Sequence, residues 1–364
     1  MGLADRFPKR APVAVKGAEA RAEAMKDLVF GREFTDHMAR AIYTDGVGWH
    51  SHELTAYGPL VLSPATNALH YAQEIFEGLK AYRHADGSVW AFRPQKNAER
   101  FQRSARRLAM AEMPVDDFLG SIEAVVQADH EWVPSVPDSS LYLRPFAFGS
   151  EPFLGVHPSS EITYLLIASP VGPYFATGYG PVSIWVTREY NRAAPGGTGA
   201  AKTGGNYAAS LLPTNEAYAN GCQQVCFLDA ATDTLLEELG GMNMMLVLDD
   251  GSVATPRLTG TILEGVTRDS VLTLLREDGI AVAERDISID ELTDGIRSGR
   301  IREVFACGTA AVITPIGRLA SKDFDITVGD GQPGALTTEL YNHLTDIQFG
   351  RAEDVHGWLY PLVP

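Results

Sequence analysis

A glycine-rich stretch from Glu189 to Tyr207 constrains the fold of this chain more than any other segment does. It carries five glycines around a single lysine, Lys202. Glycine lets the backbone adopt positive φ and approach a ligand closely, but it loses more conformational entropy on folding than any other residue. That cost indicates a functional site. A lysine among glycines suits a phosphate-binding loop, a buried general base or a Schiff-base nucleophile, and a solvated surface lysine is the alternative.

The length of 364 residues is too great for one ordinary hydrophobic core, so the chain is expected to form two domains. We place a linker over 173–181, in a segment rich in Gly, Pro and Tyr. A small N-terminal α/β domain with an N-terminal arm is expected over 1–172, and a larger C-terminal domain over 182–364.

Composition and charge exclude several classes of protein. The formal net charge of −16 argues against nucleic-acid or anionic-membrane binding, which needs a basic surface. Three cysteines cannot form a disulfide framework in so long a chain, and no ligand set completes a metal site, so reduced core thiols are expected. Without an apolar segment typical of a signal peptide or a membrane span, we expect a cytoplasmic protein.

Periodicity predicts a helix over Ala68–Arg83, interrupted at Gly78, and strands over Gln224–Leu228 and Asn243–Leu248. Another predicted helix, over Asn97–Met110, carries four arginines at 100, 103, 106 and 107. Their spacing is compatible either with a solvated helix face or with arginines that together bind an anionic ligand.

Three further patterns suit anionic ligands. Tyr142 and Arg144 share one side of a predicted strand and together can hold a carboxylate, although a surface arginine is the alternative. A loop that starts at Leu258 runs into a helix ending near Asp278, and such a helix start favours phosphate. The Gly-Thr-Ala turn after Cys307 resembles a second anion cradle.

A nucleotide-binding phosphate loop is the competing interpretation of the stretch. Gly196, Lys202 and Thr203 are in register with that motif. Ala201 stands where glycine is required, and Gly204-Gly205 fall where the helix of the motif should begin.

The motifs together resemble those of the branched-chain amino-acid aminotransferases, which are fold-type IV pyridoxal phosphate enzymes. They occur in order and cover nearly the whole chain beyond residue 30. The matching segments are Phe34-Thr-Asp-His-Met, Ala68-Leu-His-Tyr-Ala, Ile75-Phe-Glu-Gly-Leu-Lys-Ala-Tyr-Arg, Arg144-Pro, Ala201-Lys-Thr-Gly-Gly-Asn-Tyr, Glu238-Leu-Gly-Gly-Met-Asn, Gly265-Val-Thr-Arg and Cys307-Gly-Thr-Ala.

The resemblance implies an α+β or α/β fold of two domains, similar to D-amino-acid aminotransferase, with mixed sheets, flanking helices and pyridoxal phosphate bound by the C-terminal domain. It implies reversible transfer of an amino group between L-leucine, L-isoleucine or L-valine and 2-oxoglutarate, by a homodimer whose sites share residues across the interface. A D-amino-acid aminotransferase or an aminodeoxychorismate lyase of the same fold is the alternative, and a non-catalytic nucleotide-binding protein is a remote one.

The resemblance also implies the cofactor site. Lys202 would bind the cofactor aldehyde covalently and then move a proton, and Glu238 would lie beside the pyridine nitrogen, with Glu237 as its competitor in the sequence. Phosphate binding would fall to Arg100, the backbone of Val266 and Thr267 and the hydroxyl of Thr309. Tyr207 would bond the phenolic oxygen, and the glycines near Lys202 would clear space for the ring.

For the substrate, the resemblance implies an apolar pocket lined by Phe34, Phe76, Tyr142 and Tyr174. Arg144 would bind the second carboxylate of glutamate, while Tyr71 and the backbone of Thr309 and Ala310 would hold the α-carboxylate. Tyr71 and Val156 are expected to act across a dimer interface. Ala311 and Thr314 replace a Cys-x-x-Cys redox pair that some members carry, so thiol regulation is not expected.

Overall fold

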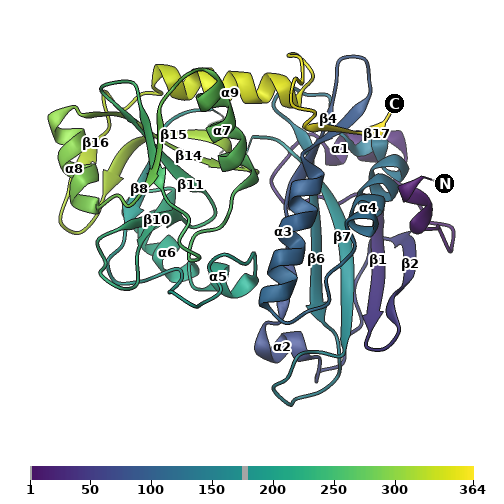
Figure 1. The fold of residues 1–364 in the computed structure, drawn as a ribbon. Helices are drawn as coiled ribbons and strands as arrows, with labels where there is room; N and C mark the ends of the chain where they lie inside the picture. The colour runs from purple at the N-terminus through teal and green to yellow at the C-terminus, as the bar shows by residue number, and fades with distance from the viewer. Residues whose placement is uncertain (1, 174–178) are drawn as a thin grey trace. The chain divides into compact units, whose positions relative to one another are not determined.

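The computed structural model describes residues 2–173 and 179–364, and two compact units account for them (Figure 1). Unit 1 contains the described residues up to 173 together with Ala201–Gly204 and Asp346–Pro364. Unit 2 contains residues 179–200 and Gly205–Thr345. Because much of the predicted linker over 173–181 falls outside the described residues, the domain boundaries stay a prediction. None of the described helices is long and apolar enough to cross a membrane.

Unit 1 is built on an antiparallel sheet, with eight strands among the described residues. The strand order is β17 (Leu359–Val363), β5 (Val89–Phe92), β4 (Leu79–Arg83), β6 (Ser140–Gly149), β7 (Glu161–Val171), β1 (His37–Thr44) and β2 (Gly48–Ala56), with β3 (Glu74–Phe76) also paired to β6. The helical segments of this part are η1 (Leu3–Arg6), α1 (Ala18–Ala24), α2 (Asn67–Tyr71), α3 (Pro94–Arg107), α4 (Val115–Ala128) and η2 (His130–Trp132).

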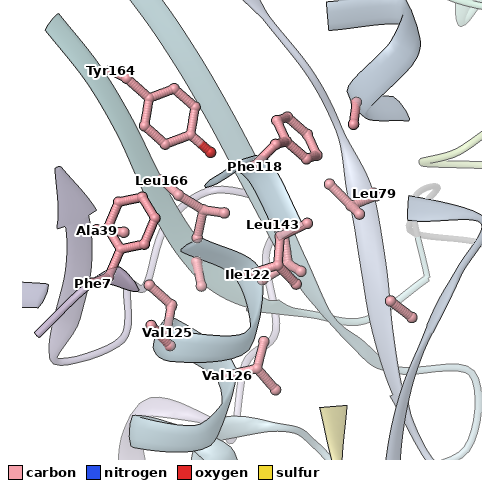
Figure 2. Close-up of a cluster of buried hydrophobic side chains, with 14 of the residues drawn as sticks. Phe7, Ala39, Leu79, Phe118, Ile122, Val125, Val126, Leu143, Tyr164 and Leu166 are labelled. Atoms are coloured by element: carbon pink, nitrogen blue, oxygen red, sulfur yellow. The ribbon is translucent and has the colours of Figure 1, made fainter. Parts of the chain in front are cut away.

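The core of unit 1 lies between α4 and the sheet. Phe118, Ile122 and Val125 recur at helical spacing on α4 and are buried. Figure 2 shows them beside Tyr164 and Leu166 of β7. The Tyr164 hydroxyl is 2.7 Å from the Ser121 hydroxyl of α4, so the one polar group of this aromatic side chain has a partner inside the core.

The helix predicted over Ala68–Arg83 is wrong. Only α2 is helical, and it ends because Ala72 adopts the left-handed conformation at φ 51°. The rest of the segment forms β3 and β4, whose backbone groups pair with β6. Sheet pairing therefore overrides the local helical pattern, and Tyr71 and Phe76 do not share a helix face.

The arginine-rich segment does form a helix, α3, with Pro94 at its first position. Arg100 points inward and is 4% exposed, alongside the buried Phe101 and Ser104. The arginines at 103, 106 and 107 are exposed, and Arg106 pairs with Glu112. Of the four arginines, Arg100 is therefore buried, and the other three form a solvated face.

Unit 2 is built on a mixed sheet, with nine strands among the described residues. Parallel pairing joins β8 to β9, β8 to β15, and β12 to β13, while the other neighbours are antiparallel. The strand order is β10 (Leu236–Leu239), β9 (Gln224–Leu228), β8 (Val182–Val186), β15 (Val312–Ala320), β14 (Ile301–Gly308), β11 (Asn243–Leu248), β12 (Val253–Pro256) and β13 (Val282–Arg285), with β16 (Asp325–Thr327) on β15. The remaining helices are α5 (Gly204–Ala208), α6 (Leu211–Ala219), α7 (Val266–Glu277), α8 (Ile289–Ser298) and α9 (Ala335–Gln348).

Candidate active site

The backbone around Lys202 is pinned to the sheet and to α3 of unit 1. The Lys202 N–H donates to Ser104 Oγ at 2.9 Å, and its carbonyl accepts from the Phe76 N–H at 3.0 Å. The Thr203 hydroxyl donates to the Glu74 carbonyl at 2.7 Å. These bonds fix the point from which the side chain starts. The Lys202 Nζ lies 4.9 Å from the centre of the Phe76 ring, so the amine rests on an aromatic surface.

Phe76 also contacts the arginine predicted to bind a carboxylate. Arg144 Cζ lies 4.7 Å from the centre of the Phe76 ring, and Arg144 Nη2 donates to the Tyr142 hydroxyl at 3.2 Å. A Cβ at Gly78 would overlap the Tyr142 hydroxyl, so a larger residue there would displace the Tyr142 ring. The structure therefore brings Lys202, Phe76, Tyr142 and Arg144 together within unit 1, where cationic groups suit an anionic substrate.

Arg100 is joined to a carboxylate that sequence reasoning missed, Glu77. Arg100 Nε donates to Glu77 Oε1 at 2.7 Å, and Arg100 Nη2 donates to Oε2 at 2.9 Å. Asn97 Nδ2 adds a bond to Oε2 at 2.8 Å. Burial alone would raise the pKa of Glu77, but Arg100, Lys202 and Asn97 together hold that pKa below its usual range. The only signal for Glu77 in the sequence was its place in a motif quoted for its neighbours.

The other predicted substrate residues of unit 1 contact residues outside this cluster, or are exposed. The Phe34 ring stacks on Tyr57, with centroids 4.8 Å apart. Tyr71 is 40% exposed and its hydroxyl donates to the Leu154 carbonyl, while Val156 is 83% exposed. Tyr174 lies outside the described residues.

In unit 2, the two neighbouring acids of β10 have different partners. Glu238 Oε1 lies 2.8 Å from Arg192 Nη1 and accepts the Leu263 N–H at 2.9 Å. Glu237 accepts a hydrogen bond from the Thr261 hydroxyl. Burial raises the pKa of Glu237, and the Thr261 bond and the charge of Arg192 oppose that rise only in part. Glu238 is thus the acid in direct contact with a guanidinium.

The predicted phosphate-binding groups of unit 2 lie at a helix start and in a turn. Val266 and Thr267 are the first two residues of α7, and the first N–H groups of a helix have no partner within it. A Cβ at the preceding Gly265 would overlap the Asn243 amide, so a larger residue there would have to displace that side chain. Thr309 and Ala310 are half-buried between β14 and β15. Tyr207, on α5, is also half-buried.

Two glycines near Lys202 lie close to other parts of the protein. A Cβ on Gly199 would overlap the backbone of Thr261 within unit 2, and a Cβ on Gly204 would overlap the Glu74 carboxylate within unit 1. These two glycines admit neighbouring parts of the protein itself. All three cysteines are buried free thiols.

Comparison with known proteins assigns the chain to a family. The model of the family described as amino-transferase class IV matches residues 74–319, so the chain belongs to the class IV aminotransferases. The branched-chain-amino-acid aminotransferase of Mycolicibacterium smegmatis is 53% identical over 334 residues, which cover 91% of each chain. Branched-chain-amino-acid transaminase 1 of Bacillus subtilis is 45% identical over 91% of this chain and 93% of the relative.

Solved structures give the same family. The branched-chain amino acid aminotransferase of Escherichia coli has a TM-score of 0.74 at 30% identity and covers 89% of this chain and 99% of its own. The branched-chain amino acid aminotransferase from T.th., solved with pyridoxamine 5'-phosphate, has a TM-score of 0.74 at 27% identity, with the same coverage of 89% and 99%. The predicted resemblance to branched-chain aminotransferases, the fold class and pyridoxal phosphate as the cofactor are confirmed.

The groups described above fit this cofactor. Lys202 is a primary amine on a fixed backbone, Glu238 is a buried carboxylate with a cationic partner, and the N-terminus of α7 is of the kind that binds phosphate. Sequence reasoning missed Arg192, which lies in the glycine-rich stretch but belongs to none of the motifs that carried the resemblance.

Proposed function

We propose that this protein is a branched-chain amino-acid aminotransferase that moves an amino group reversibly between L-leucine, L-isoleucine or L-valine and 2-oxoglutarate. The observation that carries the proposal is the cluster in unit 1, in which the Lys202 amine and the Arg144 guanidinium both lie against Phe76. A proton-moving amine beside a carboxylate-binding arginine and an apolar ring suits substrates that carry either an aliphatic or an acidic side chain.

The residues that would hold the cofactor are Arg100, Lys202, Tyr207, Glu238, Val266, Thr267 and Thr309. When bound, pyridoxal phosphate supplies an aldehyde and a ring that accepts the electrons left at the substrate Cα. The Lys202 Nζ, as a neutral amine, takes the proton from Cα, and its ammonium form returns a proton. Arg100 and the first N–H groups of α7 would bind the phosphate, and Glu238 would supply a negative charge that favours protonation of the pyridine nitrogen.

Substrate selection would rest on the aromatic side chains and Arg144. Phe34, Phe76 and Tyr142 would contact the aliphatic chain, and Tyr174 keeps this predicted role although it lies outside the described residues. Arg144 would bind the distal carboxylate of glutamate. Tyr71 and the backbone at Thr309 and Ala310 would bind the α-carboxylate common to every substrate.

We also propose that the protein is a homodimer. Apolar side chains gather at the surface of unit 1, where Asn67 N–H bonds the Glu151 carbonyl and the Tyr71 hydroxyl bonds the Leu154 carbonyl. An exposed apolar patch of this kind marks an interaction site. The exposed apolar residues of these two segments are Leu69, Tyr71, Phe153, Leu154 and Val156. Tyr71 and Val156 would then serve the partner's site.

Buried free thiols support a cytoplasmic location.

A half-reaction panel tests the function. The purified holoenzyme is mixed with L-leucine, L-glutamate or D-alanine, and loss of the visible cofactor absorption is followed; with aminodeoxychorismate the release of pyruvate is followed, because a lyase returns the cofactor unchanged. The proposal expects loss with L-leucine and L-glutamate. Turnover of D-alanine or aminodeoxychorismate without turnover of L-leucine would assign the protein to another activity of the same fold.

A further inference from the structure

Arg192 is buried at the start of the glycine-rich stretch and contacts one of the two acids of β10. Its side chain is 1% exposed, and that of Glu238 is 2% exposed. The 2.8 Å between Arg192 Nη1 and Glu238 Oε1 makes a charge-assisted contact of ordinary length. All of this lies within unit 2, so the pair is part of the packing of that unit.

The same guanidinium holds the loop that carries the second donor to Glu238. Arg192 Nη1 donates to the Thr261 carbonyl at 3.0 Å, and the Leu263 N–H two residues later donates to Glu238 Oε1 at 2.9 Å. Arg192 therefore acts on Glu238 directly and also through the position of residues 261–263. The close approach of Gly199 to the Thr261 backbone places the glycine-rich stretch against that loop.

A buried glutamate needs such a partner to stay charged. Transfer of a carboxylate out of water favours its protonated form, unless a cation and hydrogen bonds compensate for the lost hydration. Arginine is suited to this task because its guanidinium stays protonated and offers several donors in one plane. Glu237, the neighbour of Glu238, receives a hydroxyl instead, and burial raises its pKa. The direct contact with Arg192 thus distinguishes two adjacent acids.

We propose that Arg192 is a positioning residue for the aminotransferase reaction, which keeps Glu238 ionised and fixed so that the pyridine nitrogen of the cofactor stays protonated. This inference rests on the proposed role of Glu238. Without Arg192, the ionised form of Glu238 would be less stable, and the ring nitrogen would be protonated less fully. The ring would then accept electrons from the substrate Cα less readily. Substrate binding would be little affected.

The test compares Arg192→Gln, Arg192→Lys and Glu238→Gln with the wild-type holoenzyme and with Arg188→Gln as a matched control. Arg188 is an exposed arginine directly before the glycine-rich stretch, so its replacement removes a charge without disturbing the buried pair. Each protein is loaded with pyridoxal phosphate labelled with ¹⁵N in the ring, and the ¹⁵N chemical shift reports protonation of that nitrogen. Steady-state kinetics with L-leucine follow on the same samples.

Arg192→Gln is expected to move the ¹⁵N signal toward the unprotonated position, as Glu238→Gln does, and to lower kcat about 10- to 100-fold with KM changed little. Arg192→Lys should give an intermediate signal and recover part of kcat. It also serves as the informative variant if the glutamine protein does not fold. Arg188→Gln should match the wild type.

An unchanged ¹⁵N signal in both Arg192 variants, with the signal moved in Glu238→Gln, would overturn the inference and leave the proposed function intact. An unchanged signal in Glu238→Gln would instead overturn the proposed role of Glu238, and the role of Arg192 with it.

Discussion

The Glu77 carboxylate accepts two hydrogen bonds from the Arg100 guanidinium, of 2.7 and 2.9 Å. Both side chains are almost fully buried inside unit 1. Two of the donors of the proposed phosphate-binding arginine are therefore committed to a carboxylate of the protein itself. This arrangement fixes the plane of the guanidinium. It also makes the stability of unit 1 depend on a charge pair.

We predict that Glu77→Gln destabilises the protein by about 3 kcal/mol or more, because it leaves the Arg100 charge buried without a counterion. Urea unfolding followed by circular dichroism measures the change. Arg106→Gln is the control, because Arg106 lies on the same helix as Arg100 but pairs with Glu112 at the exposed surface. This variant should unfold at the same urea concentration as the wild type. Equal stability of Glu77→Gln and wild type would contradict the prediction.

A second prediction concerns Gly199. Because a Cβ there would overlap the Thr261 backbone, Gly199→Ala should force a shift of one loop and destabilise the protein by about 1 to 3 kcal/mol. Gly205→Ala is the matched control, since a Cβ at Gly205 would meet no atom within 4 Å. Thermal unfolding of the two variants compares them directly. A midpoint for Gly199→Ala as high as that of the control would refute the overlap.

The raised pKa of Glu237 gives a pH dependence with a definite sign. A carboxyl whose folded pKa lies above the unfolded value stabilises the fold while it is protonated. That contribution is complete below the unfolded pKa of about 4.3 and is lost as pH rises through the folded pKa. Glu237→Gln should therefore gain stability relative to wild type as pH increases through this window. Urea unfolding of both proteins at a series of pH values from about 4 upward checks it, and parallel curves would count against it.

Arg144 should discriminate between the two kinds of substrate. Loss of a charge-assisted hydrogen bond costs about 1.5 to 3 kcal/mol, so Arg144→Gln is expected to lower kcat/KM for L-glutamate roughly 10- to 150-fold. The value for L-leucine should change far less, because an aliphatic chain makes no such bond. Half-reaction rates with the two amino acids supply the ratio. A uniform loss for both would remove Arg144 from the specificity role.

Lys202→Ala should lose the visible absorption that borohydride abolishes in the wild type, since only a primary amine at this position can bind the cofactor aldehyde covalently. Spectra before and after reduction, followed by peptide mass analysis, locate the modified residue. Full retention of that absorption in the variant would rule out this role for Lys202.

Where local pattern and long-range pairing agree, the sequence predicts the fold well. The strands over Gln224–Leu228 and Asn243–Leu248 have the predicted bounds, because buried apolar runs between turn residues leave few alternatives. Over Ala68–Arg83 the pattern is helical, but β6 lies far along the chain and its pairing cannot be read locally. The residue in the left-handed conformation that ends α2 is Ala72, not a glycine, so the sequence does not indicate where this helix ends.

The candidate site divides in the same way. Motif register pointed to Lys202 and Glu238, but spacing could not say which arginine of α3 turns inward or which acid of β10 meets a cation. Those choices depend on Glu77 and Arg192, which approach from other segments of the chain. Contacts between residues far apart in the sequence cannot be predicted from the spacing of residues within one segment.

The pairing of β17 with β5 sets an order in which this protein can fold during its synthesis. Residues 359–363 complete the edge of a sheet whose other strands all come from the first 171 residues, and Leu362 is buried in their core. Synthesis must therefore proceed past residue 363 before unit 1 can close, long after its remaining strands have been made. During that interval the edge of β5 stays open to other chains, which makes it the place where chaperones would be needed most.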